Sequence, residues 1–249
     1  MNYINNIQAE WIKTKRTASN WLSLIGGLFI PLITTLVYFH QKITLNTLPK
    51  NGWAMHYSSS WEKMAIFLLP MGMILAGSLI TQIESKNNTW KQVHATPQSF
   101  TNIFFSKFTV ILFMSMKFFI YFNIGVLLSG LIPTLALEGS MPTDSFPFWD
   151  VLKLNIKIFI ACMPILAFQY FLSLRFKNFL VPIGIGLLGL IGTLIGGPWD
   201  HIYISPYSYT FYAVMPKETW FNPTIFALIS FAVIMIVSLF LYLRSKDKG

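Results

Sequence analysis

Long apolar runs separated by short polar segments dominate the pattern of this sequence. Each run is close to the roughly 20 residues that an α-helix needs to cross the hydrocarbon layer of a membrane. Short segments of alternating polarity, typical of membrane β-strands, do not occur. We therefore expect one all-α integral membrane domain over residues 1–249, with about six transmembrane helices at residues 20–39, 64–83, 108–132, 156–174, 179–196 and 224–243.

The segment 1–19, ahead of the first run, is polar but carries apolar residues at helical spacing. Ile4, Ile7 and Trp11, together with Ile12, would share one face of a helix. Three basic residues end this segment: Lys13, Lys15 and Arg16. The pattern predicts an amphipathic helix on the inner membrane surface. The segment lacks the small-residue cleavage site of a secretory signal peptide.

The composition supports a membrane protein. Hydrophobic residues make up 54% of the chain and charged residues only 11%, whereas a soluble domain has about 25% charged residues. The net charge of +9 comes from small clusters between the apolar runs, not from one face or tail. We therefore do not expect nucleic acid as a partner, and the lipid bilayer is the expected environment.

The distribution of Lys and Arg between the loops predicts the orientation. On the side of both termini lie eleven basic residues: Lys13, Lys15, Arg16, Lys86, Lys91, Lys107, Arg175, Lys177, Arg244, Lys246 and Lys248. On the other side lie six: Lys42, Lys50, Lys63, Lys153, Lys157 and Lys217. Because cytoplasmic loops carry the excess of basic residues, both termini are expected in the cytoplasm.

The loop after the second run has the pattern of a short amphipathic helix. It would cover Thr89 to Ala95 and end at Pro97. Trp90, Val93 and His94 would share one face of this helix. Two interpretations stay open from the residues alone: the helix docks in a groove of a soluble partner, or it only lies on the membrane.

Two segments carry a resemblance to a known family. The first is Glu10-Trp11-Ile12-Lys13-Thr14-Lys15-Arg16, just before a span. The second is Glu84…Thr89-Trp90-Lys91-Gln92…Ala95-Thr96-Pro97…Phe100…Lys107-Phe108. Both resemble permeases of the type-2 ABC transporter class, and most closely the lantibiotic-immunity and bacitracin-resistance permeases of bacteria. The resemblance extends over the whole chain in length and helix layout.

The resemblance implies a role for each segment. The N-terminal helix, with Trp11, Lys13, Lys15 and Arg16, would be the elbow helix at the inner leaflet. The loop would couple the permease to a separate cytoplasmic ABC ATPase through Glu84, Thr89, Trp90, Lys91, Val93 and His94. The permease would form a homodimer, or a heterodimer with a related permease, in the plasma (inner) membrane of a bacterium. Its substrate would be an antimicrobial peptide or another amphiphile removed from the membrane.

Several motifs of catalytic and binding sites are absent from the sequence. Without a G-x-x-x-x-G-K-[ST] motif the chain has no phosphate-binding loop, so we expect it to bind no cofactor and ATP to bind the partner subunit. H-E-x-x-H and G-x-S-x-G motifs are also absent. The four histidines are spread over loops on both sides, so neither a metal site nor a catalytic site is expected.

Three polar residues lie within the predicted spans. Lys117 is either functional or a snorkelling residue, one whose long side chain reaches the inner interface from a third span that starts later. Asn123 and Gln169 either join helices by hydrogen bonds or contact substrate. Two further function classes remain open: a membrane scaffold or sensor that transports nothing, and an intramembrane enzyme.

Two other stretches predict local structure. The segment 197–222 is dense in Trp and Tyr, which favour the headgroup level of a bilayer, so we expect short helices there at the outer interface. The fifth span carries small residues that favour close packing against a neighbouring helix, within the chain or across a dimer: Gly184, Gly186, Gly189 and Gly192.

Overall fold

The computed structural model describes residues 3–14, 18–49, 51–86, 99–176, 178–215 and 219–246. Within these ranges the chain is helical and contains no strand. Its α-helices are α1 (Tyr3–Thr14), α2 (Ala18–Gln41), α3 (Gly52–Lys63), α4 (Leu69–Lys86), α6 (Phe100–Glu138), α7 (Phe148–Arg175), α8 (Leu180–Ile195), α9 (Ser208–Val214) and α10 (Pro223–Lys246). Three shorter elements are the 3₁₀-helices η1 (Leu45–Thr47) and η3 (Ile202–Ile204) and the π-helix η2 (Met64–Leu68).

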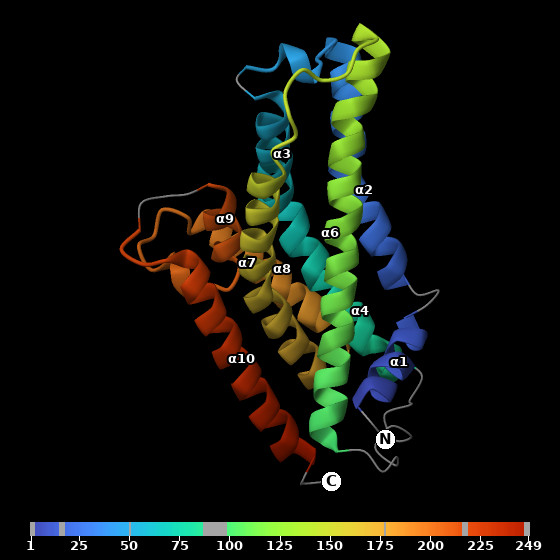
Figure 1. The fold of residues 1–249 in the computed structure, drawn as a ribbon. Coiled ribbons are helices and arrows are strands. Elements are labelled where there is room, and N and C mark those ends of the chain that lie inside the picture. Colours follow the sequence, from blue (N-terminus) through green and yellow to red (C-terminus); the bar gives the residue numbers. More distant parts are fainter. Residues whose placement is uncertain are drawn as a thin grey trace.

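Helix α6 organises the bundle. Its 39 residues correspond to about 58 Å of α-helix, and Figure 1 shows it running the full length of the molecule. Both α2 and α1 pack on α6, α2 along its upper part and α1 beside its lower part. On the other side α7 packs against α4 and α10. The start of α6 and the end of α10 lie at the same end of the molecule (Figure 1).

The second predicted span begins earlier than expected. Residues 64–83 were predicted, but α3, η2 and α4 form a continuous helical segment, apolar over Gly52–Thr81. The polar residues of α3 are buried because they find partners inside the bundle. Ser60 donates to the His56 carbonyl at 2.7 Å, and the His56 ring contacts the Val126 carbonyl at 2.8 Å. A run of apolar residues alone does not reveal such partners.

Five of the six predicted spans are long and apolar enough to cross a membrane in the described part of the chain: Ser19–Gln41, Gly52–Thr81, Phe100–Glu138, Phe148–Arg175 and Pro223–Arg244. The third and fourth are longer at both ends than the predicted 108–132 and 156–174. The fifth predicted span is α8, which has only 16 residues. At about 24 Å it is shorter than the roughly 30 Å of a hydrocarbon core, so its crossing does not follow from length.

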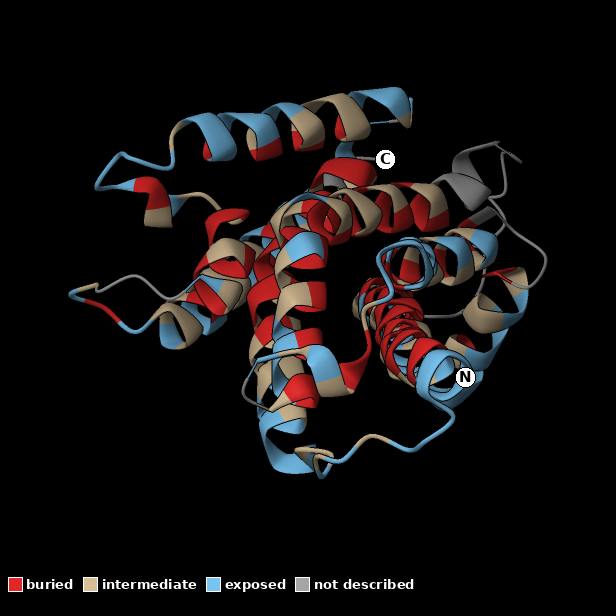
Figure 2. Cartoon of the chain, turned by 90° about the horizontal axis from the view of Figure 1, so that it is seen from above, coloured by how far each residue is buried: buried red, intermediate tan, exposed pale blue. Residues whose placement is uncertain are grey.

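The core lies between α4, α6 and α7. Its largest fully buried side chains include Trp61, Phe104, Phe122 and Tyr170. Buried residues face the inside of the bundle and exposed ones its outside (Figure 2). Only 17% of the apolar stretch of α10 is buried, against 61% for Gly52–Thr81. Exposed apolar helix faces of this kind are the faces that lipid or another membrane helix covers.

Close packing in α8 depends on some of its glycines only. A Cβ atom on Gly186 would lie 2.7 Å from Gln169 Oε1, and one on Gly189 would lie 2.6 Å from the Tyr207 ring. Both glycines are therefore required for these contacts. A Cβ on Gly184 or Gly192 would meet no atom of the described chain within 4 Å. The prediction of close packing is confirmed within the chain for Gly186 and Gly189. For Gly184 and Gly192 it stays a prediction, because packing across a dimer was also expected.

Candidate functional site

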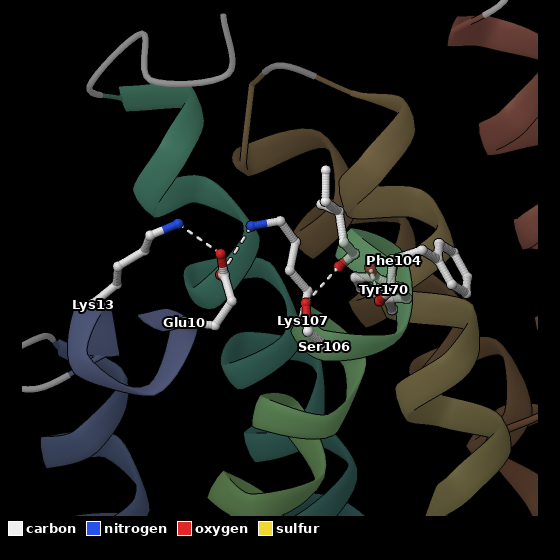
Figure 3. A network of polar contacts seen from close by, with 7 residues as sticks. Glu10, Lys13, Phe104, Ser106, Lys107 and Tyr170 are labelled. Atoms are coloured by element: carbon white, nitrogen blue, oxygen red, sulfur yellow. Dashed lines mark hydrogen bonds and ion pairs between the residues drawn. The ribbon is translucent and has the colours of Figure 1, made fainter. Parts of the chain in front are cut away.

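An ion cluster joins the N-terminal helix to α6. The Glu10 carboxylate accepts hydrogen bonds from Lys13 Nζ at 2.6 Å and from Lys107 Nζ at 2.9 Å, as Figure 3 shows. The side chains of Lys107 and Glu10 are only 5% and 12% exposed. A charge buried this far requires an opposite charge, because desolvation without one costs several kcal/mol, on the order of 3–5 kcal/mol. The pair therefore holds α1 against α6.

Aromatic contacts continue this interface. The Trp11 ring lies edge-on to Phe113, with 5.9 Å between ring centroids, and Lys117 Nζ lies 4.3 Å from the Trp11 centroid. Ile7 lines the same interface, whereas Ile4 and Ile12 are exposed. The predicted amphipathic helix is present. Its apolar residues were expected to share one face, but some of them contact α6 and others are exposed. Of its predicted basic residues, Lys15 and Arg16 lie outside the described residues.

Lys117 lies beside the start of α2. Its Nζ donates to Asn20 Oδ1 at 3.2 Å, and the apolar stretch of α2 begins at Ser19. The third helix starts earlier than predicted, at Phe100, and not later as the snorkelling interpretation assumed. Lys117 is nevertheless level with the end of a neighbouring span, where a lysine reaches polar surroundings at low cost. Whether Lys117 takes part in function stays a prediction.

The other two polar residues within spans contact neighbouring helices. Asn123 and Asn155 form a reciprocal amide pair between α6 and α7, with distances of 2.6 and 3.0 Å. Gln169 Nε2 donates to Ser78 Oγ at 2.8 Å and joins α7 to α4. Sequence reasoning missed Asn155, which stands just before the predicted fourth span. Its spacing from the apolar run offered no signal, because the pairing depends on which helix lies opposite.

A groove of 580 Å³ lies between α6 and α7 around the amide pair. Its walls are apolar except for the two asparagines and Tyr57: Met116, Phe119, Ile120, Ile124, Leu127, Phe146, Phe148, Val151, Leu152, Ile156 and Phe159. A second groove of 520 Å³ lies between α1 and α6. Met116 and Ile120 line both grooves, so the two are neighbours on one face of α6.

Polar contacts close the end of the molecule opposite α1. The Glu138 carboxylate, at the end of α6, accepts hydrogen bonds from Thr44 Oγ1 and from Asn46 Nδ2. The Gly52 amide donates to the Asp144 carboxylate at 2.8 Å. These contacts hold the loops before α3 and before α7 against the end of α6. They therefore fix the position of the residues at that end of the α6–α7 groove.

The predicted coupling loop is described only at its edges. Glu84 lies in the last turns of α4, whereas Thr89, Trp90, Lys91, Val93 and His94 lie outside the described residues. After the loop, Ser99 caps α6 by accepting a hydrogen bond from the Asn102 amide. In sequence order, this loop lies between the end of α4 and the start of the helix that lines both grooves.

The aromatic segment before α10 forms the short helices that the sequence predicts, η3 and α9. Its residues pack on one another and on the start of α10. Tyr209 OH donates to the Tyr203 carbonyl at 2.7 Å and lies 2.8 Å from Ser230 Oγ. Burial raises the pKa of the Tyr207 and Tyr209 phenols above the usual value.

The comparisons with known proteins agree with this architecture. The family described as ABC-2 family transporter protein matches residues 6–194, from α1 almost to the end of α8. A search of curated proteins found no match to the chain. The family match covers well over half of the sequence and includes the ion cluster, the amide pair and both grooves. The chain is a multi-pass membrane protein and belongs to the ABC-2 transporter family.

Proposed function

We propose that this chain is the membrane-spanning permease subunit of an ATP-driven exporter that removes an amphiphile, such as an antimicrobial peptide, from a bacterial plasma membrane. The observation that carries the proposal is the groove between α6 and α7. Its 580 Å³ lie within the range of roughly 300–1,000 Å³ that is usual for ligand sites. An amphiphile suits it because the walls are apolar and an amide pair lies inside.

The amide pair supplies the polar contact. Each asparagine side chain also donates to a carbonyl of its own helix, Asn123 to Phe119 and Asn155 to Val151, both at 2.8 Å. A polar group of a substrate can replace one asparagine amide as the partner of the other. The displaced asparagine keeps its hydrogen bond to the carbonyl of its own helix, so neither amide is left fully unpaired. The exchange keeps the cost of entry low, because an unpaired polar group in an apolar site costs about 1–3 kcal/mol.

Energy for transport would come from a separate cytoplasmic ABC ATPase, which would bind ATP in place of this chain. The proposed contact is the loop that carries Glu84, Thr89, Trp90, Lys91, Val93 and His94, with both termini on the same cytoplasmic side. Because α6 is the first described helix after this loop, a push on the loop would act on a helix that lines the groove. A rigid helix transmits such a displacement along its whole length.

The exporter would contain two permeases, either two copies of this chain or this chain and a related one. The exposed apolar faces of α2 and α10 support this arrangement, since 28% and 17% of their apolar stretches are buried within one chain. The elbow helix α1, docked by Glu10 and Lys107, would lie at the inner leaflet beside the start of α2.

The experiment fills the groove and measures protection. Cells that carry the chain with its ATPase are compared with cells that carry Ile124→Trp, using the inhibitory concentration for a panel of amphiphilic antimicrobial peptides. Ile124 lines the groove and is 53% exposed. We expect protection to fall about tenfold, as for the loss of a binding interaction of roughly 1.4 kcal/mol.

Ile132→Trp is the matched control. Ile132 lies on the same helix and is 46% exposed, but it does not line the groove. Equal loss of protection in both variants would contradict the assignment of the groove. No protection by the unaltered chain against any peptide, with the ATPase bound, would favour a scaffold or sensor or another substrate class.

A further inference from the structure

The groove between α1 and α6 differs in chemistry from the one between α6 and α7. Its walls come from Ile7, Gln8 and Trp11 of α1 and from Phe113, Met116, Lys117 and Ile120 of α6. Phe113, Met116 and Ile120 are 41%, 49% and 56% exposed, so this groove is open toward the surroundings of the bundle. Apart from the Gln8 amide and the Lys117 ammonium, its lining is apolar or aromatic.

Lys117 is the charged residue in this lining. Its described contacts are neutral: the Asn20 carboxamide at 3.2 Å and the Trp11 ring at 4.3 Å. No carboxylate of the described chain lies within ion-pair distance of it. A lysine ammonium has three N–H donors, and the contact with Asn20 uses one of them. With a second donor directed at the Trp11 ring, the positive charge and one donor remain for a ligand.

The depth of Lys117 in the membrane restricts the chemical class of that ligand. Asn20, its partner, lies at the beginning of the apolar stretch Ser19–Gln41, and α1 lies alongside. The apolar stretch of α2 begins at this level, where such a span meets headgroups, and Trp11 is a residue that favours the headgroup level. A ligand with its anion at Lys117 would extend its apolar part along Met116 and Ile120, away from α1 and into the bilayer.

We propose that this groove is a binding site for an anionic phospholipid, with the phosphate at Lys117 and one acyl chain along Met116 and Ile120. The charge complementarity selects an anionic lipid over a zwitterionic one, because an uncompensated ammonium attracts a net negative headgroup. Gln8, exposed at the rim, adds an amide that can donate to the headgroup. The site goes beyond the proposed transport function and requires no ATPase.

Such a lipid would act on the interface that it touches. It would cover Trp11 and bridge α1 to α6 beside the pair between Glu10 and Lys107. Because Met116 and Ile120 also line the α6–α7 groove, the acyl chain would adjoin the proposed substrate path. The lipid composition of the membrane would then influence both the docking of α1 and the shape of that groove.

The test uses the quenching of Trp11 fluorescence by brominated lipids. The full chain is reconstituted in phosphatidylcholine vesicles that contain a small fraction of brominated phosphatidylglycerol, and separately of brominated phosphatidylcholine. Subtracting the signal of Trp11→Phe isolates Trp11 from the other tryptophans. We expect half-maximal quenching at an about fivefold lower fraction of the anionic lipid, the usual effect of one basic residue near the membrane surface.

Lys117 variants sharpen the test. Lys117→Met should remove the preference for phosphatidylglycerol, whereas Lys117→Arg should keep it. The control is Lys153→Met, since Lys153 is 78% exposed at the start of α7, 4.0 Å from Asp150, and outside the groove. A size-exclusion profile like that of the unaltered chain confirms that each variant is folded.

Three results would overturn the proposal. The first is equal quenching of Trp11 by the two lipids in the unaltered chain. The second is an undiminished preference in Lys117→Met, and the third is a preference lost equally in Lys153→Met. Absence of quenching together with a dimer held at this face would assign the groove to a second copy of the chain. None of these results depends on transport, so they leave the proposed function to its own test.

Discussion

The two sides of helix α6 contrast in how tightly they pack. On one side α2 approaches α6 so closely that a Cβ on Gly27 would lie 3.1 Å from the Phe118 carbonyl, and one on Gly125 would lie 2.8 Å from Pro31. On the other side bulky residues separate α6 from α7 and leave a groove of 580 Å³. One helix thus has a close-packed face and a loose face.

This contrast in packing indicates which elements are expected to move together. Small residues allow backbones to approach and dispersion contacts to accumulate, so we expect α2 and α6 to move as one unit. Helix α1 joins this unit through Glu10 and Lys107. Across the groove, the amide pair of Asn123 and Asn155 is the polar link between α6 and α7. A displacement of α7 against that unit requires little repacking, as expected for a path that opens and closes.

Among substitutions that test the two sides of α6, Glu10→Gln is expected to lower the stability most. The substitution removes the negative charge from a pair in which Lys107 is 5% exposed, and should lower the free energy of unfolding by about 3 kcal/mol. Thermal unfolding in mild detergent measures the change. Asp150→Asn is the control, because Asp150 is 80% exposed and its ion pair with Lys153 is worth little. Equal stability of both variants would show that α1 is not held by this pair.

A smaller effect is expected from Gly125→Leu on the close-packed face. The new side chain would collide with Pro31 and push α2 away, costing about 2 kcal/mol of overpacking. Gly192→Leu adds the same atoms where nothing of the described chain lies within 4 Å, and should be near neutral. The same unfolding measurement compares the two. A neutral Gly125→Leu would mean that α2 and α6 are not in close contact.

The smallest effect is expected on the loose face. Asn155→Leu leaves Asn123 without its partner across the groove and should cost about 1 kcal/mol, as is usual for hydrogen bonds between membrane helices. Replacing both asparagines with leucine should cost less than the sum of the single changes, since no amide is then left unpaired. A double-mutant cycle by thermal unfolding measures this coupling, and strict additivity would exclude the pair as a link.

Several residues of the candidate site could be predicted from the sequence, but the residues that they contact could not. The polarity of Asn123 and Gln169 inside apolar runs was sufficient to single them out. Asn155 and Ser78, to which they bind, lie on other helices and carry no local signal. The apolar face of α1 was predictable from spacing, yet its division between α6 and the exposed side follows from where α6 lies.

That this is a helical membrane protein, and approximately where its spans lie, follows from the pattern of apolar residues along the chain. The reason is physical: in a bilayer each backbone amide must be satisfied within its own helix, so an apolar run long enough to cross becomes a helix whatever its neighbours are. The two segments that resemble type-2 ABC transporter permeases could likewise be recognised from short stretches of sequence.

Which helices meet, and therefore which residues form the site, became known from the packing of the folded chain. The polar residues of α3 are buried because α6 supplies partners for His56, and α6 has a close face and a loose face because α2 and α7 lie on different sides of it. Lys117 contacts Trp11 and Asn20, which are about a hundred residues away in the sequence. Such pairings depend on packing between helices, which hydrophobicity along one chain does not specify.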